Sequence, residues 1–212
     1  SNSILAQSVQ QKVKQYRQAN EIIIINRYKE FLSIPNVSRD TPNIKRNAAY
    51  IAATMTRLGI KAELLEGITP GVTPAVYGKI TVPGAKQTIA FYAHYDGQPV
   101  NPKQWASGLL PFQPVFLSDP VERGGKIVEL PANAITIDPH WRLSGRGSAD
   151  DKAGVMTILN AYEALLLSKV ALNNNIIFFF EGEEEIGSIH IAEIFEKNKQ
   201  KLQADVWIIA DG

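Results

Sequence analysis

The sequence predicts an α/β fold, with a mixed, largely parallel sheet and helices on both faces. Two observations favour this class. Helix-like and strand-like segments alternate through the second half of the 212 residues, an order that builds parallel sheets covered by helices. The run Ile176–Phe180 is apolar without alternation, as expected of a strand whose two faces are both buried.

The first half is expected to begin with two helices. One covers about Ile4–Leu32, and Pro35 lies just beyond it. The second covers Asn43–Leu58, with Thr41 as its cap and Pro42 in its first turn. Its apolar side chains recur at helical spacing and predict one buried face, made by Ile44, Ala48, Ile51, Ala52 and Met55.

Strands and helices follow in a regular order. Extended runs separated by Pro and Gly predict strands at Lys61–Leu65, Ala75–Thr81 and Thr88–Ala93. A loop-rich excursion covers Asn101–Trp141, with a short extended pair around Lys126–Leu130. The remaining elements are expected to be a buried helix, a buried strand, an amphipathic helix and another buried strand, at Asp151–Leu167, Ile176–Phe180, Ser188–Leu202 and Val206–Ala210.

Composition and charge exclude several classes of protein. The chain has no Cys, so disulfides are excluded and any zinc would be held by His, Asp and Glu. A net charge of +1 predicts no nucleic-acid surface, and no apolar run reaches the roughly 18 residues of a membrane span. Ser1, Asn2 and Ser3 resemble a remnant of tag cleavage, which leaves the compartment open: cytoplasmic by default, or exported if a signal peptide was removed.

Four segments carry Asp, Glu or His directly after a predicted strand or before a predicted helix. They are residues 93–100, 145–154, 180–188 and 204–212. In open α/β sheets, ligands gather at the carboxyl ends of the strands. This shared placement is the reason to consider the four segments together as one candidate site.

The first two segments each allow a structural and a chemical interpretation. His94 and Asp96 lie two residues apart on an extended chain, so they point to the same side, where the carboxylate can fix the tautomer of a metal-binding imidazole. The alternative is a hydrogen-bonded His at a strand end. Asp150 and Asp151 begin a predicted helix, where they are either metal ligands or simple helix caps.

The third and fourth segments are acidic. Four Glu residues fall within positions 181–185, directly after an apolar strand. Adjacent residues of a strand face opposite ways, so Glu184 and Glu185 could face one site only from a turn. Clustered carboxylates repel unless a cation neutralises them, so a metal site would explain the arrangement; a solvated acidic turn is the alternative. Asp211 ends the last predicted strand, as either a ligand or an ordinary turn residue.

Taken in order, the four segments resemble the zinc exopeptidase and deacylase family that includes carnosinase-like dipeptidases, carboxypeptidase G, aminoacylase, acetylornithine deacetylase and succinyl-diaminopimelate desuccinylase. The resemblance covers roughly Ile22 to Gly212. Two motifs favour the dipeptidase branch: HYDGQPV at positions 94–100 and FEGEEEIGS at positions 180–188. The stretch Pro114–Arg142 is longer than the family's usual connection between the first two motifs.

The resemblance implies a dinuclear zinc site, with Co²⁺ or Mn²⁺ as alternative metals. His94 and Asp211 would bind one ion, and Glu185 would bind the other. Asp150 would bridge both ions, which suits a pair about 3.5–4 Å apart. Because zinc accepts imidazole and carboxylate ligands, this ligand set agrees with the residue types of the four segments.

The same resemblance implies the chemistry. Glu184 would be the general base that takes a proton from a zinc-bridging water and passes it to the leaving amine, and Asp96 would support His94 from behind. The implied protein is a metallo-exopeptidase, a metal-dependent hydrolase that cleaves an amide bond in dipeptides or N-acyl amino acids. A deacetylase or desuccinylase of the same mechanism is one alternative. A non-catalytic interaction module is the other, for this chain by itself.

The resemblance also implies that residues 1–212 are the N-terminal portion of the catalytic, metal-binding domain. The family carries a lid or dimerisation domain, and a further His ligand to the Glu185 metal, downstream of the position of Asp211. His140 and His190 do not match that ligand. The full-length protein is therefore expected to be a homodimer acting on a small peptide or N-acyl amino acid, and the 212-residue chain alone is expected to be inactive.

Overall fold

The computed structural model describes residues 2–211. Its helices, in chain order, are α1 (Asn2–Ala19), α2 (Glu21–Leu32), α3 (Thr41–Arg57), α4 (Lys152–Leu167) and α5 (Ile191–Lys197). Its strands are β1 (Ala62–Leu65), β2 (Ala75–Ile80), β3 (Thr88–His94), β4 (Val115–Leu117), β5 (Ile127–Val128), β6 (Arg142–Ser144), β7 (Asn175–Glu181) and β8 (Val206–Ile209). No helix in this described part is long and apolar enough to cross a membrane.

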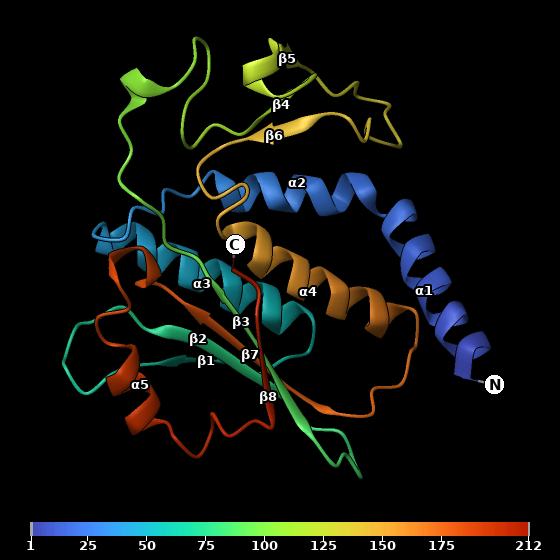
Figure 1. The fold of residues 1–212 in the computed structure, drawn as a ribbon, viewed down its shortest axis with the longest axis vertical. Coiled ribbons are helices and arrows are strands. Elements are labelled where there is room, and N and C mark those ends of the chain that lie inside the picture. Colours follow the sequence, from blue (N-terminus) through green and yellow to red (C-terminus); the bar gives the residue numbers. More distant parts are fainter. Residues whose placement is uncertain (1, 212) are drawn as a thin grey trace.

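A five-stranded sheet, in the order β1-β2-β7-β3-β8, forms the centre of the fold (Figure 1). The β1–β2 and β2–β7 pairs are antiparallel, and the β7–β3 and β3–β8 pairs are parallel. β2 alone therefore opposes the direction of the other four strands. The predicted α/β fold with a mixed, largely parallel sheet is confirmed.

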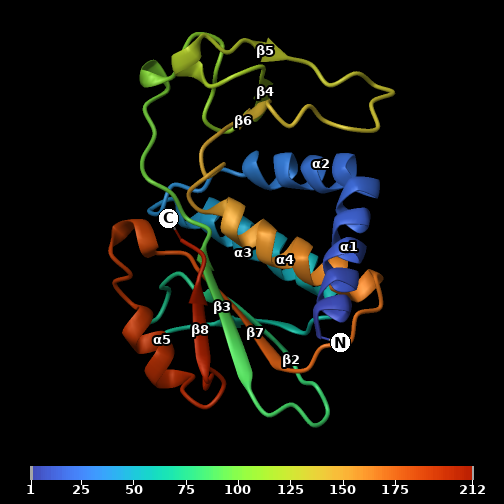
Figure 2. The ribbon, with the colours of Figure 1, turned by 45° about the vertical axis from the view of Figure 1, so that its right-hand side comes forward.

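Helices cover both faces of this sheet, as predicted. α3 and α4 lie on one face and α5 on the other (Figure 2). β7 serves both layers because successive side chains of a strand alternate between faces: Phe178 and Phe180 join the core under α3 and α4, and Phe179 joins the core under α5. All three rings are at most 1% exposed. The unbroken apolar run of this strand is thus explained by burial on both sides.

The excursion between β3 and α4 is loop-rich, as predicted. Its three short strands form a separate sheet, in the order β5-β4-β6, which lies over α2 (Figures 1 and 2). The Phe116 ring packs 5.6 Å from the Trp141 ring and lies 5.0 Å from Lys29 Nζ on α2. The Ile137 amide also donates to Glu21 Oε2. The excursion is therefore attached to the helical layer at several points.

The single long helix predicted at the start of the chain is wrong, because two helices replace it. α1 ends before Asn20 and α2 starts after it, at an angle that is visible in Figure 1. The backbone N–H and the side-chain Nδ2 of Asn20 both donate to Tyr16 O, at 3.1 and 2.9 Å. Asn side chains compete in this way with helix continuation. Apolar spacing across residues 4–32 carries no sign of the competition.

Three predicted helix ends are also corrected. The cap of α3 is Asp40, whose carboxylate accepts from Asn43 N, and Thr41 is the first helical residue. α5 is shorter than the predicted helix 188–202. Ser188 has a φ of +51°, outside the helical region, and Asn198 closes the helix by donating its Nδ2 to a carbonyl four residues back. Polar side chains that bond the backbone therefore mark the start of α3 and the end of α5.

β8 is an edge strand, although the sequence predicts a buried one. Within the described chain it pairs with β3, and its other side carries no strand. Val206, Ile208 and Ile209 remain 46%, 42% and 58% exposed. Their apolar character predicted burial, and the structure leaves them uncovered. An open apolar edge of this kind favours pairing with another strand.

A buried carboxylate joins three helices on the α4 side of the sheet. Glu163 on α4 is 3% exposed. It accepts from Arg27 Nη1 on α2 at 3.0 Å and from Arg57 Nη1 on α3 at 2.7 Å. Burial raises the pKa of Glu163, but the hydrogen bonds and charges of the two guanidinium groups more than offset this, so the net shift of the pKa is downward. The ionised form is therefore the stable one in the fold.

Glu163→Gln is expected to destabilise the fold by about 2 kcal/mol at neutral pH. Removing one partner of a buried ion pair costs about 3–5 kcal/mol, and the cost is smaller here because the side chains of Arg27 and Arg57 are 30% and 40% exposed. Because the folded pKa is depressed, the stabilisation is complete above the ordinary pKa of 4.5 and is lost as pH falls through the lower folded value.

Urea unfolding of both proteins, from about pH 7 down to about pH 3, tests this expectation. The difference in unfolding free energy should shrink toward the acid end. The exposed Glu196→Gln on α5 is the matched control, with an expected effect within about 0.5 kcal/mol. A difference for Glu163→Gln that stays constant over this range would show that the charge of Glu163 is not what stabilises the fold.

Candidate metal centre

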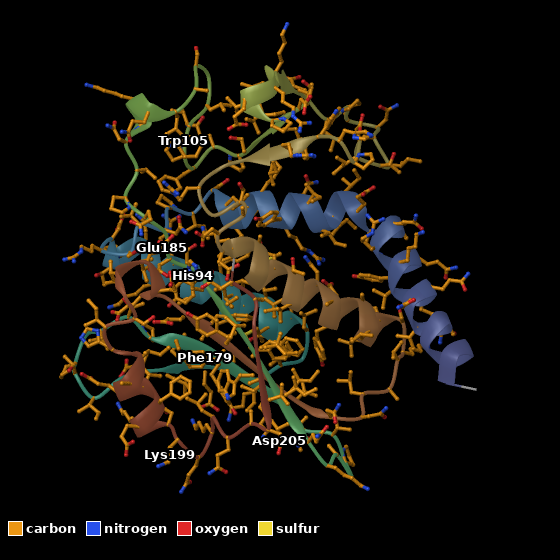
Figure 3. The ribbon with its side chains drawn as sticks, viewed as in Figure 1. His94, Trp105, Phe179, Glu185, Lys199 and Asp205 are labelled. Atoms are coloured by element: carbon orange, nitrogen blue, oxygen red, sulfur yellow. The ribbon has the colours of Figure 1, made fainter. Side chains whose placement is uncertain are left out.

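The four motif segments meet at one edge of the sheet. His94 ends β3, Glu181 ends β7, and Asp211 follows β8. Asp150 lies just before α4, on the chain that returns from the excursion. In Figure 3, His94 and Glu185 lie between the sheet and the excursion. This is the carboxyl end of the parallel strands, where the topology of open α/β sheets places ligands.

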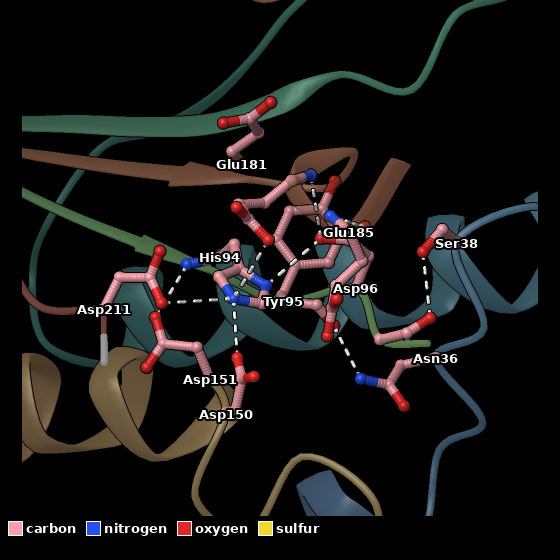
Figure 4. A network of polar contacts seen from close by, with 12 residues as sticks. Asn36, Ser38, His94, Tyr95, Asp96, Asp150, Asp151, Glu181, Glu185 and Asp211 are labelled. Carbon is pink, nitrogen blue, oxygen red and sulfur yellow. Dashed lines mark hydrogen bonds and ion pairs between the residues drawn. The ribbon is translucent and has the colours of Figure 1, made fainter. Parts of the chain in front are cut away.

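Carboxylates converge on the ring of His94 (Figure 4). His94 Nε2 lies 2.9 Å from Asp150 Oδ1 and 3.7 Å from both Glu184 Oε2 and Asp211 Oδ1. Ligand atoms of His94, Asp150 and Glu185 all lie within 4.8 Å of one another. The structure therefore brings together the four residues proposed from the sequence as metal ligands, and the proposed base with them.

The electrostatics of this cluster favour a cation. Burial lowers the pKa of His94, but the contact of its Nδ1 with the accepting carboxylate of Asp96 and the charges of Asp96, Asp151 and Glu184 more than offset it, raising the pKa to about 9. Burial, opposed by the positive ring of His94, raises the pKa of Glu184. One imidazole nitrogen facing several carboxylate oxygens is a ligand set that zinc accepts. The residues present fit a metal ion at this position.

Asp96 makes two sets of contacts, and the sequence indicated only the one with His94. Its Oδ1 lies 3.2 Å from His94 Nδ1, on the far side of the ring from the other carboxylates, as predicted. The same carboxylate also accepts from the backbone N–H groups of Glu184 and Glu185, at 3.2 and 3.1 Å. Asp96 is fully buried. It therefore holds the ring and the acidic turn in one arrangement, which spacing along the chain could not reveal.

The sequence left open whether Asp150 and Asp151 are metal ligands or helix caps. In the structure, one of the two residues fits each interpretation. Asp151 is the N-cap of α4: its carboxylate accepts from Gly154 N at 3.0 Å and from His94 N at 2.9 Å. The Asp150 side chain is 60% exposed and faces the His94 ring. The peptide bond between the two acids is cis.

Asp151 also lies close enough to His94 and Asp211 to be considered a ligand. Both of its oxygens are engaged by backbone N–H groups, however, and the residue is 3% exposed. Asp150, by contrast, accepts from no backbone N–H group among the described residues; its side chain is 60% exposed, and its Oδ1 faces His94 Nε2 at 2.9 Å. The contacts thus favour Asp150 as the metal ligand and Asp151 as the residue that secures β3 to α4.

Lys152, the residue that follows Asp150 and Asp151, connects the start of α4 to the end of α2. It is fully buried, and its Nζ donates at 2.7 Å to Phe31 O and to Ile34 O, at the end of α2. Carbonyl groups at a helix C-terminus carry partial negative charge that favours a cation. Nζ also lies 4.5 Å from the centre of the Phe31 ring. The start of α4 is therefore fixed to the end of α2.

The acidic segment after β7 forms the predicted turn, a short 3-10 helix over Glu184–Ile186. The two other carboxylates of the segment are buried within the protein. Glu181 accepts from the Tyr92 hydroxyl at 2.7 Å, and Glu183 lies 2.8 Å from Nδ1 of His190. The turn therefore directs only two of its four carboxylates toward the site, and His190 is engaged elsewhere.

Gly182 makes this turn sterically feasible. A Cβ at this position would lie 2.5 Å from the hydroxyl oxygen of Tyr95 and 2.6 Å from Thr73 Cγ2. Tyr95 is fully buried and donates its hydroxyl proton to Pro74 O at 2.6 Å, so it has little room to move. Gly187 closes the turn with a φ of +88°, a conformation that glycine adopts readily.

Fold and site together define an α/β protein with a His- and carboxylate-lined centre suited to a metal ion, at the carboxyl ends of the sheet. The chain belongs to peptidase family M20/M25/M40, whose family description matches residues 90–212. That range contains all four motif segments. The resemblance drawn from the motifs is therefore confirmed.

Curated relatives are metallodipeptidases and dipeptidases. The chain is 26% identical over 199 residues to the "Cys-Gly metallodipeptidase dug1" of Schizosaccharomyces pombe, covering 88% of this chain and 37% of that protein. It is 26% identical over 209 residues to the "Beta-Ala-His dipeptidase" of Homo sapiens, covering 92% and 37%. The chain thus spans little more than a third of the length of these relatives. The dipeptidase branch fits, and the family implies a metal cofactor.

Solved structures show the same fold. The "M20 family metallo-carboxypeptidase Sso-CP2" of Sulfolobus solfataricus superposes with a TM-score of 0.69 at 34% identity, covering 89% of this chain and 37% of that one. "Human carnosine dipeptidase 1" superposes with a TM-score of 0.74 at 25% identity, covering 95% and 41%. In both cases the similarity extends over most of this chain but over less than half of the solved chain.

Proposed function

We propose that this chain supplies most of a two-zinc centre in a metallo-exopeptidase. His94 and Asp211 would hold one ion, Glu185 would hold the other, and Asp150 would contact both. The observation that carries the proposal is the position of His94 Nε2, which lies within 4 Å of carboxylate oxygens of Asp150, Glu184 and Asp211. Co²⁺ and Mn²⁺ are alternative metals, because both accept the same nitrogen and oxygen ligands.

The residues of the chain then have distinct tasks. Metal ions at this centre would acidify a water molecule and polarise the scissile carbonyl. Glu184 takes the proton of the attacking water and passes it to the leaving amine. In the metal-free chain, burial raises the pKa of its carboxyl group. Asp96 keeps the ring of His94 and the turn that carries Glu184 in register.

The proposed substrates are dipeptides, with N-acyl amino acids as a second class. Support comes from the relatives, which are named as dipeptidases in the curated proteins and as a metallo-carboxypeptidase among solved structures. A deacylase of the same mechanism would use the same metal ligands. A non-catalytic interaction module would have no use for a base beside a metal centre, so the placement of Glu184 near His94 favours an enzyme.

We further propose that the chain is the N-terminal portion of a longer catalytic domain, in a protein that is a homodimer at full length. The apolar edge of β8 supports the first part, because Val206, Ile208 and Ile209 would be covered by a further strand. The share of the relatives' length that the chain spans, 37%, agrees with it. A further His ligand to the Glu185 metal would come from that additional sequence.

Zinc titration by calorimetry, together with a hydrolysis assay on a set of dipeptides and N-acetyl amino acids, tests the proposal in the full-length protein. Two bound zinc ions and faster turnover of dipeptides are expected, and removal of metal by a chelator should abolish the activity. Preferred hydrolysis of N-acetyl amino acids would favour the deacylase. Zinc binding without hydrolysis of either class would favour the interaction module.

A further inference from the structure

Gln98 contacts a proposed metal ligand directly. Its Nε2 donates to Glu185 Oε2 at 2.6 Å and to Glu185 O at 3.2 Å. One side-chain amide therefore engages both the carboxylate and the backbone of the same residue. A carboxylate has two oxygens, so a hydrogen bond to Oε2 leaves Oε1 free for a metal ion.

The backbone of Gly97, next to Gln98, is fixed by contacts with the loop between α2 and α3. Gly97 O accepts from Ser38 N at 3.0 Å and from Ser38 Oγ at 2.9 Å, and Gly97 forms a β-bridge with Val37. A Cβ on Gly97 would lie 2.9 Å from Asn36 Nδ2, so the loop between α2 and α3 packs against the chain here. The base of the Gln98 side chain is thus placed by contacts that do not involve the acidic turn.

Asp96 and Gln98, which belong to the same segment, both form hydrogen bonds with the acidic turn at residues 184–186. Asp96 accepts from the backbone N–H groups of Glu184 and Glu185, and Gln98 donates to the carbonyl and carboxylate of Glu185. The two residues are separated by one, so on extended chain their side chains point to the same side. Asp96 fixes the backbone of the turn, and Gln98 fixes the direction of the Glu185 side chain.

We propose that Gln98 is a positioning residue that orients the Glu185 carboxylate for its metal ion. The inference rests on the proposed function, because it presupposes that Glu185 is a ligand. Hydrogen-bond partners of metal ligands restrict the ligand's orientation before the ion arrives, and their loss typically costs 10–100-fold in metal affinity. Gln98 touches no reacting atom in this arrangement, so its effect reaches the reaction through Glu185.

The test compares zinc affinities of the full-length protein and three variants. Gln98→Ala removes both hydrogen bonds, and Gln98→Leu keeps much of the side-chain volume without the donor. Gln104→Ala is the matched control: Gln104 is exposed, and its side chain makes no hydrogen bond among the residues that the structure describes. Stepwise zinc titration resolves the two sites, and urea unfolding of the metal-free proteins reports on the fold.

Affinity of the zinc site that Glu185→Gln weakens is expected to fall about 10-fold in Gln98→Ala and by a similar factor in Gln98→Leu, with the other site and the urea midpoint unchanged. In a Glu185→Gln background, Gln98→Ala should have no additional effect on that site, because the coupled partner is already altered. This dependence on Glu185 is a result that a purely structural role of Gln98 would not produce.

Four results would overturn the inference. Unchanged affinity in Gln98→Ala would do so, as would an equal loss in Gln104→Ala. A parallel fall of both zinc affinities and the urea midpoint would assign Gln98 to the stability of the fold instead. If the unmodified protein bound no zinc, the proposed two-metal centre would fail and this inference with it. Normal zinc binding with an unaffected Gln98→Ala variant would overturn the inference alone.

Discussion

Glu184→Gln should lower kcat about a thousandfold in the full-length protein and leave the bound zinc unchanged. The change replaces a carboxylate with an amide of the same shape, which cannot accept the proton of the attacking water. General-base catalysis contributes about 10²–10⁴-fold, so an effect in the middle of that range is expected. The side chain lies 3.7 Å from His94 Nε2 and is 36% exposed, so the fold should tolerate the change.

The neighbouring substitution separates the two roles in the acidic turn. Glu185→Gln should weaken one zinc site, because a ligand must donate a lone pair and an amide oxygen is a poorer donor than a carboxylate. Metal content by elemental analysis and kcat with saturating zinc distinguish the variants. Equal zinc loss in both would show that the roles of Glu184 and Glu185 have been confused. The exposed Glu122→Gln should behave as the unmodified protein.

Asp150→Ala should remove activity and weaken both zinc sites together. Asp150 is the one residue proposed to contact both ions, and its Oδ1 lies 2.9 Å from His94 Nε2. The loss of affinity should exceed about a hundredfold, the upper end of what partners behind the ligands contribute. Because the side chain is 60% exposed, the stability of the metal-free fold should change little.

Asp151→Ala is the informative comparison for this variant. It removes the acceptor for Gly154 N and His94 N, so it should destabilise the metal-free fold, by about 1 kcal/mol for the lost helix cap or more. Urea unfolding and zinc titration of both variants measure the contrast. A stable Asp151→Ala protein that has lost both zinc ions, beside an Asp150→Ala protein that retains them, would reverse the assignment.

Much of the fold could be predicted because the spacing of apolar residues indicates which faces are buried, and Pro and Gly mark where helices and strands end. The unbroken apolar run of β7 indicated a strand covered on both faces, and Phe178, Phe179 and Phe180 indeed serve two cores. The helix break at Asn20 could not be predicted in this way, because it depends on a hydrogen bond to Tyr16 O. The exposure of β8 depends on which strands lie beside it, and this information is absent from the residues of β8 itself.

The candidate site was predictable where its residues are consecutive in a motif, and less so where contacts join separate motifs. His94, Asp150 and Asp211 could be named as candidates because each follows a strand or precedes a helix, and the family resemblance selected Asp150 over Asp151 as the ligand. The second function of Asp96, and the bond from Gln98 to the acidic turn, arise from packing between segments almost ninety residues apart. The alternation that placed His94 and Asp96 on one side extends to position 98, and this was the available signal for Gln98.

Anomalous diffraction at the zinc absorption edge, from crystals of the full-length protein grown with zinc, tests the central claim most directly. Two peaks are expected at the carboxyl ends of β3 and β8. One should contact His94, Asp150 and Asp211, and the other should contact Asp150 and Glu185. A single peak coordinated by Asp151 in place of Asp150, or no peak beside His94, would contradict the two-metal centre proposed for this chain.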